Sequence, residues 1–369
     1  MHKLFAVCPP GLESILSSEI GAQASPGGVE MEGDLLRAAR LNLTLRTATR
    51  VLVRLGDFRA TTFADLVRKA RALPFDLCLR KGEKVALRVT CRKSRLYHSG
   101  AVAARMREAI GERLSAPAPE ATADEEADSP PQLILARFDH DVCTVSADTS
   151  GALLHRRGYR LAQSRAPLRE TLAAAMLLAA GYDGSVVLAD PLCGSGTIAI
   201  EAALLARRRA PGIARSFALE RWPAFDAAAL ARLRDEARER ELAKAPHGIL
   251  ASDADPAAVR AAQENAKRAG VEADVHVEER SLREVRLEAS HGLIVTNPPY
   301  GVRLSADLTR LYSDLGDLVR RSGHRLAVLA ANRAAAAAAK LRFETAFRTQ
   351  NGGIPVELLV SSEPIATRS

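Results

Sequence analysis

The chain has 369 residues, of which 47% are hydrophobic and 26% are charged. This balance is typical of a folded protein and excludes an intrinsically disordered one, and the length exceeds what a single hydrophobic core usually holds. No apolar run approaches the roughly 20 residues that cross a bilayer. The five cysteines form no CxxC pair and no metal-ligand spacing, which argues against a disulfide scaffold and a zinc site. We therefore expect a cytoplasmic protein of two or three domains, with no membrane segment and no metal.

The net charge of +8 is concentrated near the N-terminus. Residues 1–115 contain 20 Lys and Arg residues against 11 Asp and Glu, whereas the rest of the chain contains 32 against 33. A phosphate-rich partner explains such a bias, because each neutralised phosphate releases counterions. An arginine-rich solvated surface would give the same numbers, so the charge alone leaves both interpretations open.

The first 115 residues or so combine strand-like and helix-like patterns. The run Lys84–Val89 is typical of a strand and Ala101–Ile110 of an amphipathic helix, which together predict an α+β module. Residues 116–131 form an acidic, proline-rich tract that we expect to be disordered. A further strand-like run, Leu133–Phe138, follows the tract. We therefore interpret the tract as an insertion inside the first module and not as a domain boundary.

From about residue 165 the chain alternates short apolar strands with helices. Such alternation predicts a parallel, doubly wound sheet, which binds its ligands beyond the carboxyl ends of the strands. A low-complexity run, Ala334–Ala339, is predicted to be helical. The predicted strands are Ser185–Asp190, Ile249–Asp253, Asp274–Glu278, Gly292–Thr296 and Arg325–Leu329, and the predicted helices are Pro167–Ala180, Thr197–Arg208, Pro256–Ala269 and Leu308–Ser322.

A glycine-rich turn, Asp190–Thr197, joins the first of these strands to its helix. Gly194 and Gly196 permit positive φ angles and a close approach of a ligand to the backbone. The turn also fits the GxGxxA pattern of dinucleotide sites, but the ribose-binding acid of such a site should follow about 20 residues later. The next strand-ending acid, Asp253, lies far beyond that distance, which argues against a dinucleotide site. Asp190, before the glycines, suits a ligand with an ammonium group and not a pyrophosphate.

Two further residues near this turn have predicted roles. Asp253 ends the second strand, where a carboxylate can accept both hydroxyls of a ribose, and helix capping is the alternative. Asp255, which precedes Pro256, is predicted to be the N-cap of the following helix. Cys193 lies in the cofactor turn and not opposite the substrate, so we do not expect it to be a covalent catalyst.

The run Leu293–Gly301 is a buried strand that ends in a rigid polar turn. Pro298 and Pro299 fix the backbone, so the side-chain oxygen of Asn297 and the carbonyl of Pro298 can bind the two N–H bonds of a planar amine. Tyr300 can stack on the base that carries this amine. Positioning and electrostatics then supply the catalysis, and the acceptor base must be single-stranded, looped or flipped out. A tight turn with a core tyrosine is the alternative interpretation.

The turns Asp190–Thr197 and Asn297–Arg303 together resemble those of the THUMP-domain family of guanine-N2 RNA methyltransferases. The resemblance implies a class I methyltransferase domain with a Rossmann-like sheet over residues 155–369, and a ferredoxin-like plus THUMP RNA-binding module over residues 1–154. It implies S-adenosylmethionine as methyl donor and the 2-amino group of a guanine as acceptor. The segment Arg215–Trp222 is most similar to the bacterial large-subunit ribosomal RNA branch of this family. The similarity also covers Cys8–Glu13, Leu45–Leu52 and the region to about residue 150, Asp148–Gly151, Leu154–Arg160 and Ala166–Glu170.

The resemblance also assigns the site residues. Tyr300 and Arg303 would bind the substrate. Ser281 stands where family members often have an aspartate that contacts the adenine amino group. The implied cofactor-binding residues are Glu170, Asp190, Cys193, Gly194, Ser195, Gly196, Thr197, Asp253, Ala254, Ser281 and Asn297, and the implied catalytic residues are Asn297, Pro298, Pro299 and Tyr300.

We expect RNA to be the partner, ribosomal RNA in preference to tRNA, and the chain to be a monomer. The amines of DNA adenine or cytosine, or of a protein glutamine, also suit an Asn-Pro-Pro-Tyr turn, but a peptide substrate would not need the basic N-terminal module. Cytosine C5 methylation needs a cysteine near the substrate turn, and the sequence has none there. A non-catalytic RNA-binding or ribosome-assembly factor has no reason to keep both turns.

Overall fold

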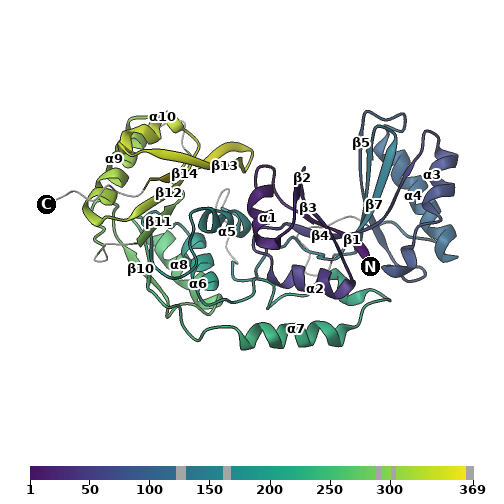
Figure 1. The fold of residues 1–369 in the computed structure, drawn as a ribbon, viewed down its shortest axis with the longest axis horizontal. Helices are drawn as coiled ribbons and strands as arrows, with labels where there is room; N and C mark the ends of the chain where they lie inside the picture. Colours follow the sequence, from purple (N-terminus) through teal and green to yellow (C-terminus); the bar gives the residue numbers. More distant parts are fainter. Residues whose placement is uncertain (122–129, 161–167, 288–291, 301–304, 363–369) are drawn as a thin grey trace. The chain divides into compact units, whose positions relative to one another are not determined.

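The computed structural model describes residues 1–121, 130–160, 168–287, 292–300 and 305–362. Contacts within the chain divide it into two compact units (Figure 1). The first unit contains Met1–Cys8, Ile20–Leu154 and Gly212–Glu236, and the second contains Pro9–Glu19, His155–Pro211 and Ala237–Ser369. Within the described ranges, no helix is long and apolar enough to cross a membrane.

The first unit is built on a seven-stranded sheet with the order β2-β3-β1-β4-β7-β6-β5. Neighbouring strands are antiparallel except β5 and β6, which are parallel. The elements of this unit are β1 (His2–Val7), β2 (Ala24–Ser25), β3 (Gly28–Gly33), α2 (Leu35–Thr44), β4 (Arg50–Arg59), α3 (Phe63–Ala70), the 3₁₀ helix η1 (Phe75–Leu77), β5 (Val85–Arg92), α4 (Ser99–Leu114), β6 (Gln132–Asp139), β7 (Val142–Asp148) and η2 (Ala218–Arg221), and α7 (Ala227–Glu239) begins in it.

The predicted α+β pattern of this region is confirmed. The strands predicted at 84–89 and 133–138 are β5 and β6, and the helix predicted at 101–110 is α4. Helix α4 buries Val102, Met106, Ala109 and Ile110, a spacing that forms one apolar stripe along a helix. Figure 1 shows α3 and α4 on the same side of β5 and β7.

The acidic tract belongs to the connection between α4 and β6. Because β5 and β6 are parallel neighbours in one sheet, α4 and the tract together form the crossover between them. The tract thus lies between two strands of one sheet, and its interpretation as an insertion inside the first module stays a prediction. The prediction that it is disordered concerns mainly residues 122–129, which lie outside the described residues.

The segment Gly212–Glu236 packs on the first unit although it follows the glycine turn in sequence. The indole N–H of Trp222 donates to Oε1 of Gln132 at 2.8 Å, and both side chains are buried. The N–H of Leu219 donates to the Thr149 carbonyl at 3.0 Å, and the guanidinium of Arg221 donates to the Pro130 carbonyl at 2.7 Å. The predicted boundary at residue 154, between the RNA-binding module and the methyltransferase domain, stays a prediction.

The second unit contains a seven-stranded sheet with the order β10-β9-β8-β11-β12-β14-β13. The strands from β10 to β12 are parallel, and β14 is antiparallel to both of its neighbours. The elements are α1 (Glu13–Ile20), α5 (Glu170–Ala179), β8 (Val187–Asp190), α6 (Thr197–Ala206), β9 (Ile249–Asp253), α8 (Pro256–Arg268), β10 (Val275–Glu279), β11 (Gly292–Thr296), α9 (Ser305–Ser322), β12 (Arg325–Ala330), α10 (Arg333–Ala336), η3 (Ala337–Ala339), β13 (Phe343–Asn351) and β14 (Ile354–Ser361).

This arrangement confirms the predicted doubly wound sheet. The chain leaves β8 toward β9 and β10, and then returns to place β11 on the other side of β8. The carboxyl ends of β8 and β11 therefore flank the point where the winding reverses, which is where sheets of this class bind ligands. The antiparallel hairpin of β13 and β14 was not predicted.

Candidate functional site

The candidate site lies at the carboxyl ends of β8, β9 and β11. Strand β8 pairs with β9 on one side and with β11 on the other, so the turns that follow these strands emerge at one edge of the sheet. The glycine turn follows β8, Asp253 ends β9, and the Asn-Pro-Pro-Tyr turn follows β11. The structure therefore brings together the two turns that the sequence singled out.

Asp190 is the most deeply buried acid of this edge, with 1% of its surface exposed. Its Oδ1 accepts a hydrogen bond from the hydroxyl of Thr296 at 2.7 Å and another from the N–H of Leu192 at 3.3 Å. Burial raises the pKa of Asp190 to about 7, against the lowering effect of these two bonds. Thr296, the last residue of β11, was not among the predicted site residues.

The structure explains the two glycines of the turn in different ways. Both have positive φ, +50° at Gly194 and +81° at Gly196, a region that other residues rarely occupy. A Cβ atom at Gly196 would lie 3.0 Å from the Cβ of Ala262 on α8, whereas a Cβ at Gly194 would meet nothing within 4 Å. Gly196 therefore permits close packing of the turn on α8, and Gly194 leaves open space beside the backbone.

Asp253 fixes the glycine turn to β9. Its Oδ2 accepts the N–H of Gly194 at 2.9 Å, and its Oδ1 accepts the N–H of Asp255 at 3.0 Å. Each carboxylate oxygen retains a further acceptor position, so these bonds leave a ribose role for Asp253 available, with Ala254 next to it. Asp255 caps α8 by accepting the N–H of Ala257 at 2.8 Å, with Pro256 in the first turn, as predicted.

Cys193 and the remaining turn residues are held by backbone contacts. The N–H of Cys193 donates to the Ser252 carbonyl at 3.0 Å, and the carbonyl of Cys193 accepts the N–H of Gly196 at 2.8 Å. Burial and the nearby carboxylates raise the pKa of the Cys193 thiol, which disfavours the nucleophilic thiolate. Ser195 uses its carbonyl to accept the side-chain N–H of Asn265 on α8 at 3.0 Å.

Glu170 lies in the first turn of α5 and is 4% exposed. Its Oε1 is 3.8 Å from Nε of Arg160, and its Oε2 has no hydrogen-bond partner among the residues that the structure describes. Burial raises the pKa of Glu170. Arg160 also donates to the hydroxyl of Thr197 at 2.6 Å, so this arginine, which was not predicted as a site residue, links the start of α5 to the start of α6.

The turn after β11 has an internal network that the sequence did not predict. The hydroxyl of Tyr300 donates to Oδ1 of Asn297. The side-chain N–H of Asn351, at the end of β13, donates to the same hydroxyl at 3.3 Å. Burial raises the pKa of Tyr300 to about 12, so the phenol stays a proton donor. The side-chain oxygen of Asn297, which is predicted to accept a substrate amine, thus accepts the phenol O–H of Tyr300 in this structure.

The other predicted residues of this region differ in accessibility. Pro298 is buried, Pro299 is exposed, and Arg303 lies outside the described residues. The hydroxyl and N–H of Ser281 both donate to Oε2 of Glu284, at 2.7 and 3.0 Å. The hydroxyl oxygen of Ser281 can still accept a hydrogen bond, so its predicted contact with adenine stays a prediction.

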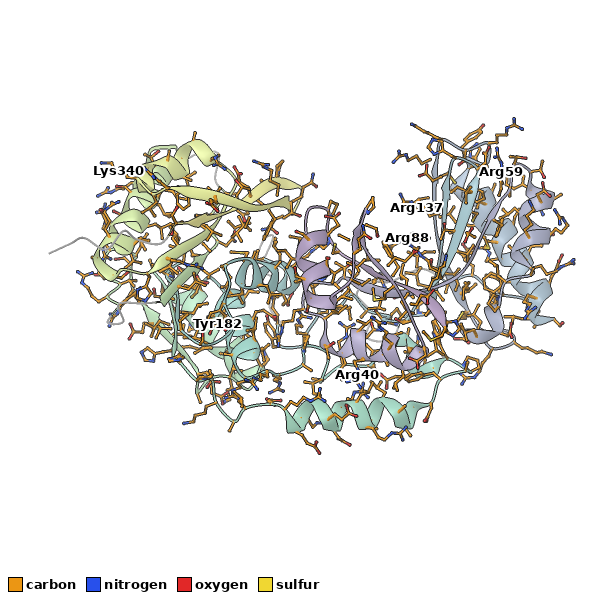
Figure 2. All side chains as sticks on the ribbon, in the orientation of Figure 1. Arg40, Arg59, Arg88, Arg137, Tyr182 and Lys340 are labelled. Carbon is orange, nitrogen blue, oxygen red and sulfur yellow. The ribbon has the colours of Figure 1, made fainter. Side chains whose placement is uncertain are left out.

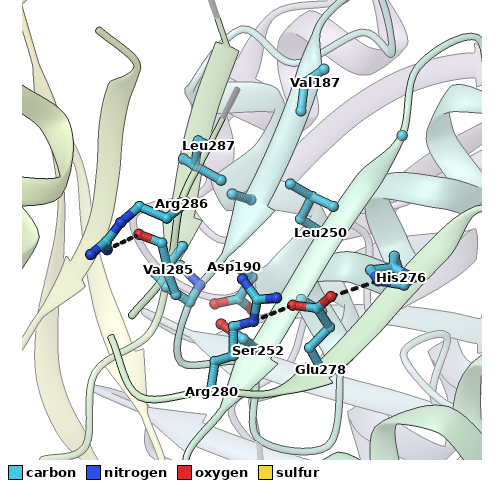
Figure 3. Close-up of a pocket in the computed structure, with 14 residues that line it drawn as sticks. Val187, Asp190, Leu250, Ser252, His276, Glu278, Arg280, Val285, Arg286 and Leu287 are labelled. Carbon is cyan, nitrogen blue, oxygen red and sulfur yellow. Dashed lines mark hydrogen bonds and ion pairs between the residues drawn. The ribbon is translucent and has the colours of Figure 1, made fainter. Parts of the chain in front are cut away.

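A cavity of about 490 Å³ borders the site along β8, β9 and β10 (Figure 3). Val187 and Leu250 form part of its apolar wall, and Asp190 is the one residue it shares with the predicted site among the described residues. Three lining residues interact: Glu278 accepts one hydrogen bond from Nε2 of His276 at 2.8 Å and pairs with Arg280 at 2.6 Å. Over the described part of the chain, no group of three or more His, Cys, Asp or Glu residues is arranged to hold a metal ion.

Comparisons with known proteins agree with this geometry. The family model described as the RMKL-like methyltransferase domain matches residues 157–358, and the RlmL ferredoxin-like domain matches residues 3–52. The ribosomal RNA large subunit methyltransferase K/L of Syntrophotalea carbinolica is 35% identical over 97% of this chain and 53% of its own length. The putative RNA methyltransferase slr0064 of Synechocystis is 32% identical over 96% of this chain and 95% of its own.

Solved structures give the same result. The putative methyltransferase SMU.472, complexed with SAH, matches 99% of both chains with a TM-score of 0.89 and 28% identity. The chain spans about half the length of the K/L enzyme that it matches, whereas it spans almost all of slr0064 and of SMU.472. The predicted class I methyltransferase fold with an N-terminal ferredoxin-like domain is therefore confirmed.

Proposed function

Because this chain belongs to the RMKL-like methyltransferase family, we propose that it transfers a methyl group from S-adenosylmethionine to the 2-amino group of a guanine in large-subunit ribosomal RNA. The observation that carries the proposal is the meeting of two turns. The hydroxyl of Thr296, the residue just before Asn297, donates a 2.7 Å hydrogen bond to the carboxylate of Asp190. A cofactor held at the first turn and an amine held at the second would thus be neighbours.

The residues of the first turn fit S-adenosylmethionine, the cofactor whose demethylated product is bound in the SMU.472 structure. Gly194 leaves open space beside the backbone. Asp190 and Glu170 are buried acids, and Oε2 of Glu170 lacks a hydrogen-bond partner among the described residues, so an ammonium group would satisfy both charge and hydrogen bonding. When bound, the cofactor supplies an electrophilic methyl group on a sulfonium.

The residues of the second turn would position the acceptor. The hydroxyl of Tyr300 already donates to Oδ1 of Asn297, which supports the proposed role of this oxygen as an acceptor for an amine N–H. The Pro298 carbonyl would accept the second N–H, and Tyr300 would stack on the base. The amide oxygen has two lone pairs, so it could accept an amine N–H and keep its bond to the phenol. Catalysis would then come from orientation, and the proton would leave to solvent.

The choice of ribosomal RNA rests on the K/L relatives, which are named ribosomal RNA large subunit methyltransferases, and on the basic N-terminal region. A tRNA guanine is the main alternative, because the same two turns would serve it. A DNA base is less favoured, since several relatives are named as RNA methyltransferases. The expected cytoplasmic location and monomeric state belong to the same proposal.

The test is nucleoside mass spectrometry on ribosomal RNA and tRNA, purified separately from cells with and without the gene. We expect loss of one N2-methylguanosine from the ribosomal fraction of the deletion strain, restored by the wild-type gene but not by an Asn297→Ala variant. Loss from tRNA alone would change the substrate and keep the chemistry. No change in either fraction would refute the proposal and favour an assembly factor or another acceptor.

A further inference from the structure

The end of the edge strand β5 in the first unit carries an exposed cluster of basic and aromatic side chains. Strand β5 is the last strand of its sheet, and the segment from Arg92 to His98 connects it to α4. The turn between β6 and β7, residues 139–141, and Arg59 at the end of β4 lie beside this segment. We call these residues, Arg59, 92–98 and 139–141, the basic tip.

Backbone contacts fix the shape of the basic tip. The N–H of Arg95 donates to Oδ1 of Asp141 at 2.8 Å, and the N–H of Asp141 donates to the hydroxyl of Ser94 at 3.0 Å. The N–H of His140 donates to the Arg92 carbonyl at 3.2 Å. The segment after β5 is thus tied to the turn after β6, so its side chains project from a defined backbone and binding would not have to order it.

Two aromatic rings are displayed on this support. Tyr97 is 72% exposed, more than any Phe, Trp or other Tyr residue of the described chain, while its neighbour Leu96 is 6% exposed and anchors the segment. The rings of Tyr97 and His98 lie with centroids 4.8 Å apart and planes 34° apart. His98 is the N-cap residue of α4, but its side chain makes no capping hydrogen bond. Neither ring has a role in the core of this unit.

The charge around the rings is positive. The segment 92–98 contains the cations Arg92, Lys93 and Arg95 and no carboxylate. The two acids of the tip are engaged, since Asp139 lies 3.7 Å from Arg92 and Asp141 lies 3.6 Å from Arg59. Four cations against two carboxylates leave the tip with an excess of positive charge.

The positive surface continues along the sheet. Arg88 on β5 and Arg137 on β6 are both exposed and belong to adjacent strands. Figure 2 shows both of them on the side of β5 and β6 that faces away from α3 and α4. A single strand of nucleic acid needs a row of cations for its phosphates and exposed rings for its bases, and this surface presents both.

We propose that the basic tip binds unpaired nucleotides of the RNA substrate, with one base stacked on Tyr97 and His98 and the adjoining phosphates against Arg92, Lys93 and Arg95. This inference rests on the proposed function, because it names the surface that would grip the RNA. The contact is independent of base identity, since every base has a π face. It would hold a looped or single-stranded segment of the substrate.

The test measures the affinity of the full chain for a fluorescein-labelled uridine oligomer of about 12 nucleotides by fluorescence anisotropy at several salt concentrations. Tyr97→Ala should weaken binding by roughly 5-fold or more without changing the salt slope, and Tyr97→Phe, which keeps the ring, should stay within about 2-fold of wild type. Arg95→Gln should lower the salt slope by about 0.7, the value for one phosphate contact to a single strand. Thermal unfolding of Tyr97→Ala should match wild type, because the side chain is exposed.

The matched control is Arg40→Gln, which removes one charge from α2 of the same unit and should leave the slope unchanged. If wild type binds the oligomer and Tyr97→Ala binds equally well, the inference is refuted while the proposed function stands. If Arg95→Gln and Arg40→Gln have equal effects, the contact is general electrostatics and the tip is no specific surface. If polyglutamate of equal charge competes as well as RNA, the surface serves an acidic protein partner. If wild type binds no RNA at all, both proposals fail together.

Discussion

The affinity of the chain for its cofactor should depend on pH through Asp190. Burial raises the pKa of this acid from its ordinary value of 3.8 to about 7. A folded acid with a raised pKa holds a proton that the unfolded chain releases, so folding becomes less favourable as pH rises from about 4 to 7. Cofactor binding should depend on pH in the opposite direction. A cofactor ammonium group stabilises the ionised carboxylate, so binding is strong above pH 7 and weakens as pH falls below it.

The magnitude follows from the ionised fraction. With a pKa of about 7, Asp190 is about 90% ionised at pH 8 and about 10% ionised at pH 6, so the affinity should fall roughly 10-fold between them, equivalent to about 1.4 kcal/mol. Thr296→Val removes the hydroxyl that donates to Oδ1. Because this bond favours the ionised form, its loss should raise the pKa further and move the midpoint to higher pH.

The assay is isothermal titration calorimetry, in which the full chain is titrated with S-adenosylhomocysteine at several pH values. Asp190→Asn is the matched control, since it has nearly the same shape and cannot titrate, and any pH dependence that belongs to the ligand appears in both proteins. Glu170→Gln separates the contribution of the second buried acid. An Asp190→Asn profile with the wild-type slope would refute the assignment to Asp190, as would a wild-type affinity equal at pH 6 and pH 8.

Three further predictions concern single residues. Asn297→Ala should lower kcat about 100-fold or more with the affinity for S-adenosylhomocysteine within about 2-fold of wild type, and an equal loss of both would contradict the division of roles. Gly194→Ala and Gly196→Ala should each lower stability in thermal unfolding by about 1–2 kcal/mol, because both residues have positive φ. Gly196→Ala should cost more, because only its Cβ would press on α8. Trp222→Phe leaves the buried amide oxygen of Gln132 without its donor and should cost about 1–3 kcal/mol in urea unfolding. Gln132→Leu should cost more, because the Gln132 amide also donates to the carbonyls of Leu133 and Asp148.

Much of the second unit follows from local sequence pattern. Strands β8, β9 and β11 are short apolar runs closed by a polar or acidic residue, and β9 and β11 have the predicted bounds, Ile249–Asp253 and Gly292–Thr296. Glycine, proline and capping residues punctuate these runs, and their effects act over a few residues. Predictions that depend on such short-range physics are confirmed, including the N-cap at Asp255.

The residues that sequence reasoning missed are those whose roles depend on distant partners. Asn351 reaches Tyr300 only because the hairpin of β13 and β14 joins the sheet, and alternation in that stretch carries no sign of a hydrogen bond across 51 residues. The sequence around Trp222 gives no sign of the residue that its indole contacts. Its partner, Gln132, lies 90 residues earlier in the other half of the chain, and no periodicity reports such a pair.

The strand order explains why Asp190 and Asn297 form one site. If the strands lay in the order of the sequence, β9 and β10 would separate β8 from β11 by three strand spacings, about 14 Å. The chain instead returns after β10 to the free side of β8, and the hydroxyl of Thr296 then reaches the carboxylate of Asp190 across 106 residues. Each turn could be recognised from its own residues, but their pairing required the doubly wound order. The chemistry proposed here therefore depends on a topological reversal as much as on the residues of either turn.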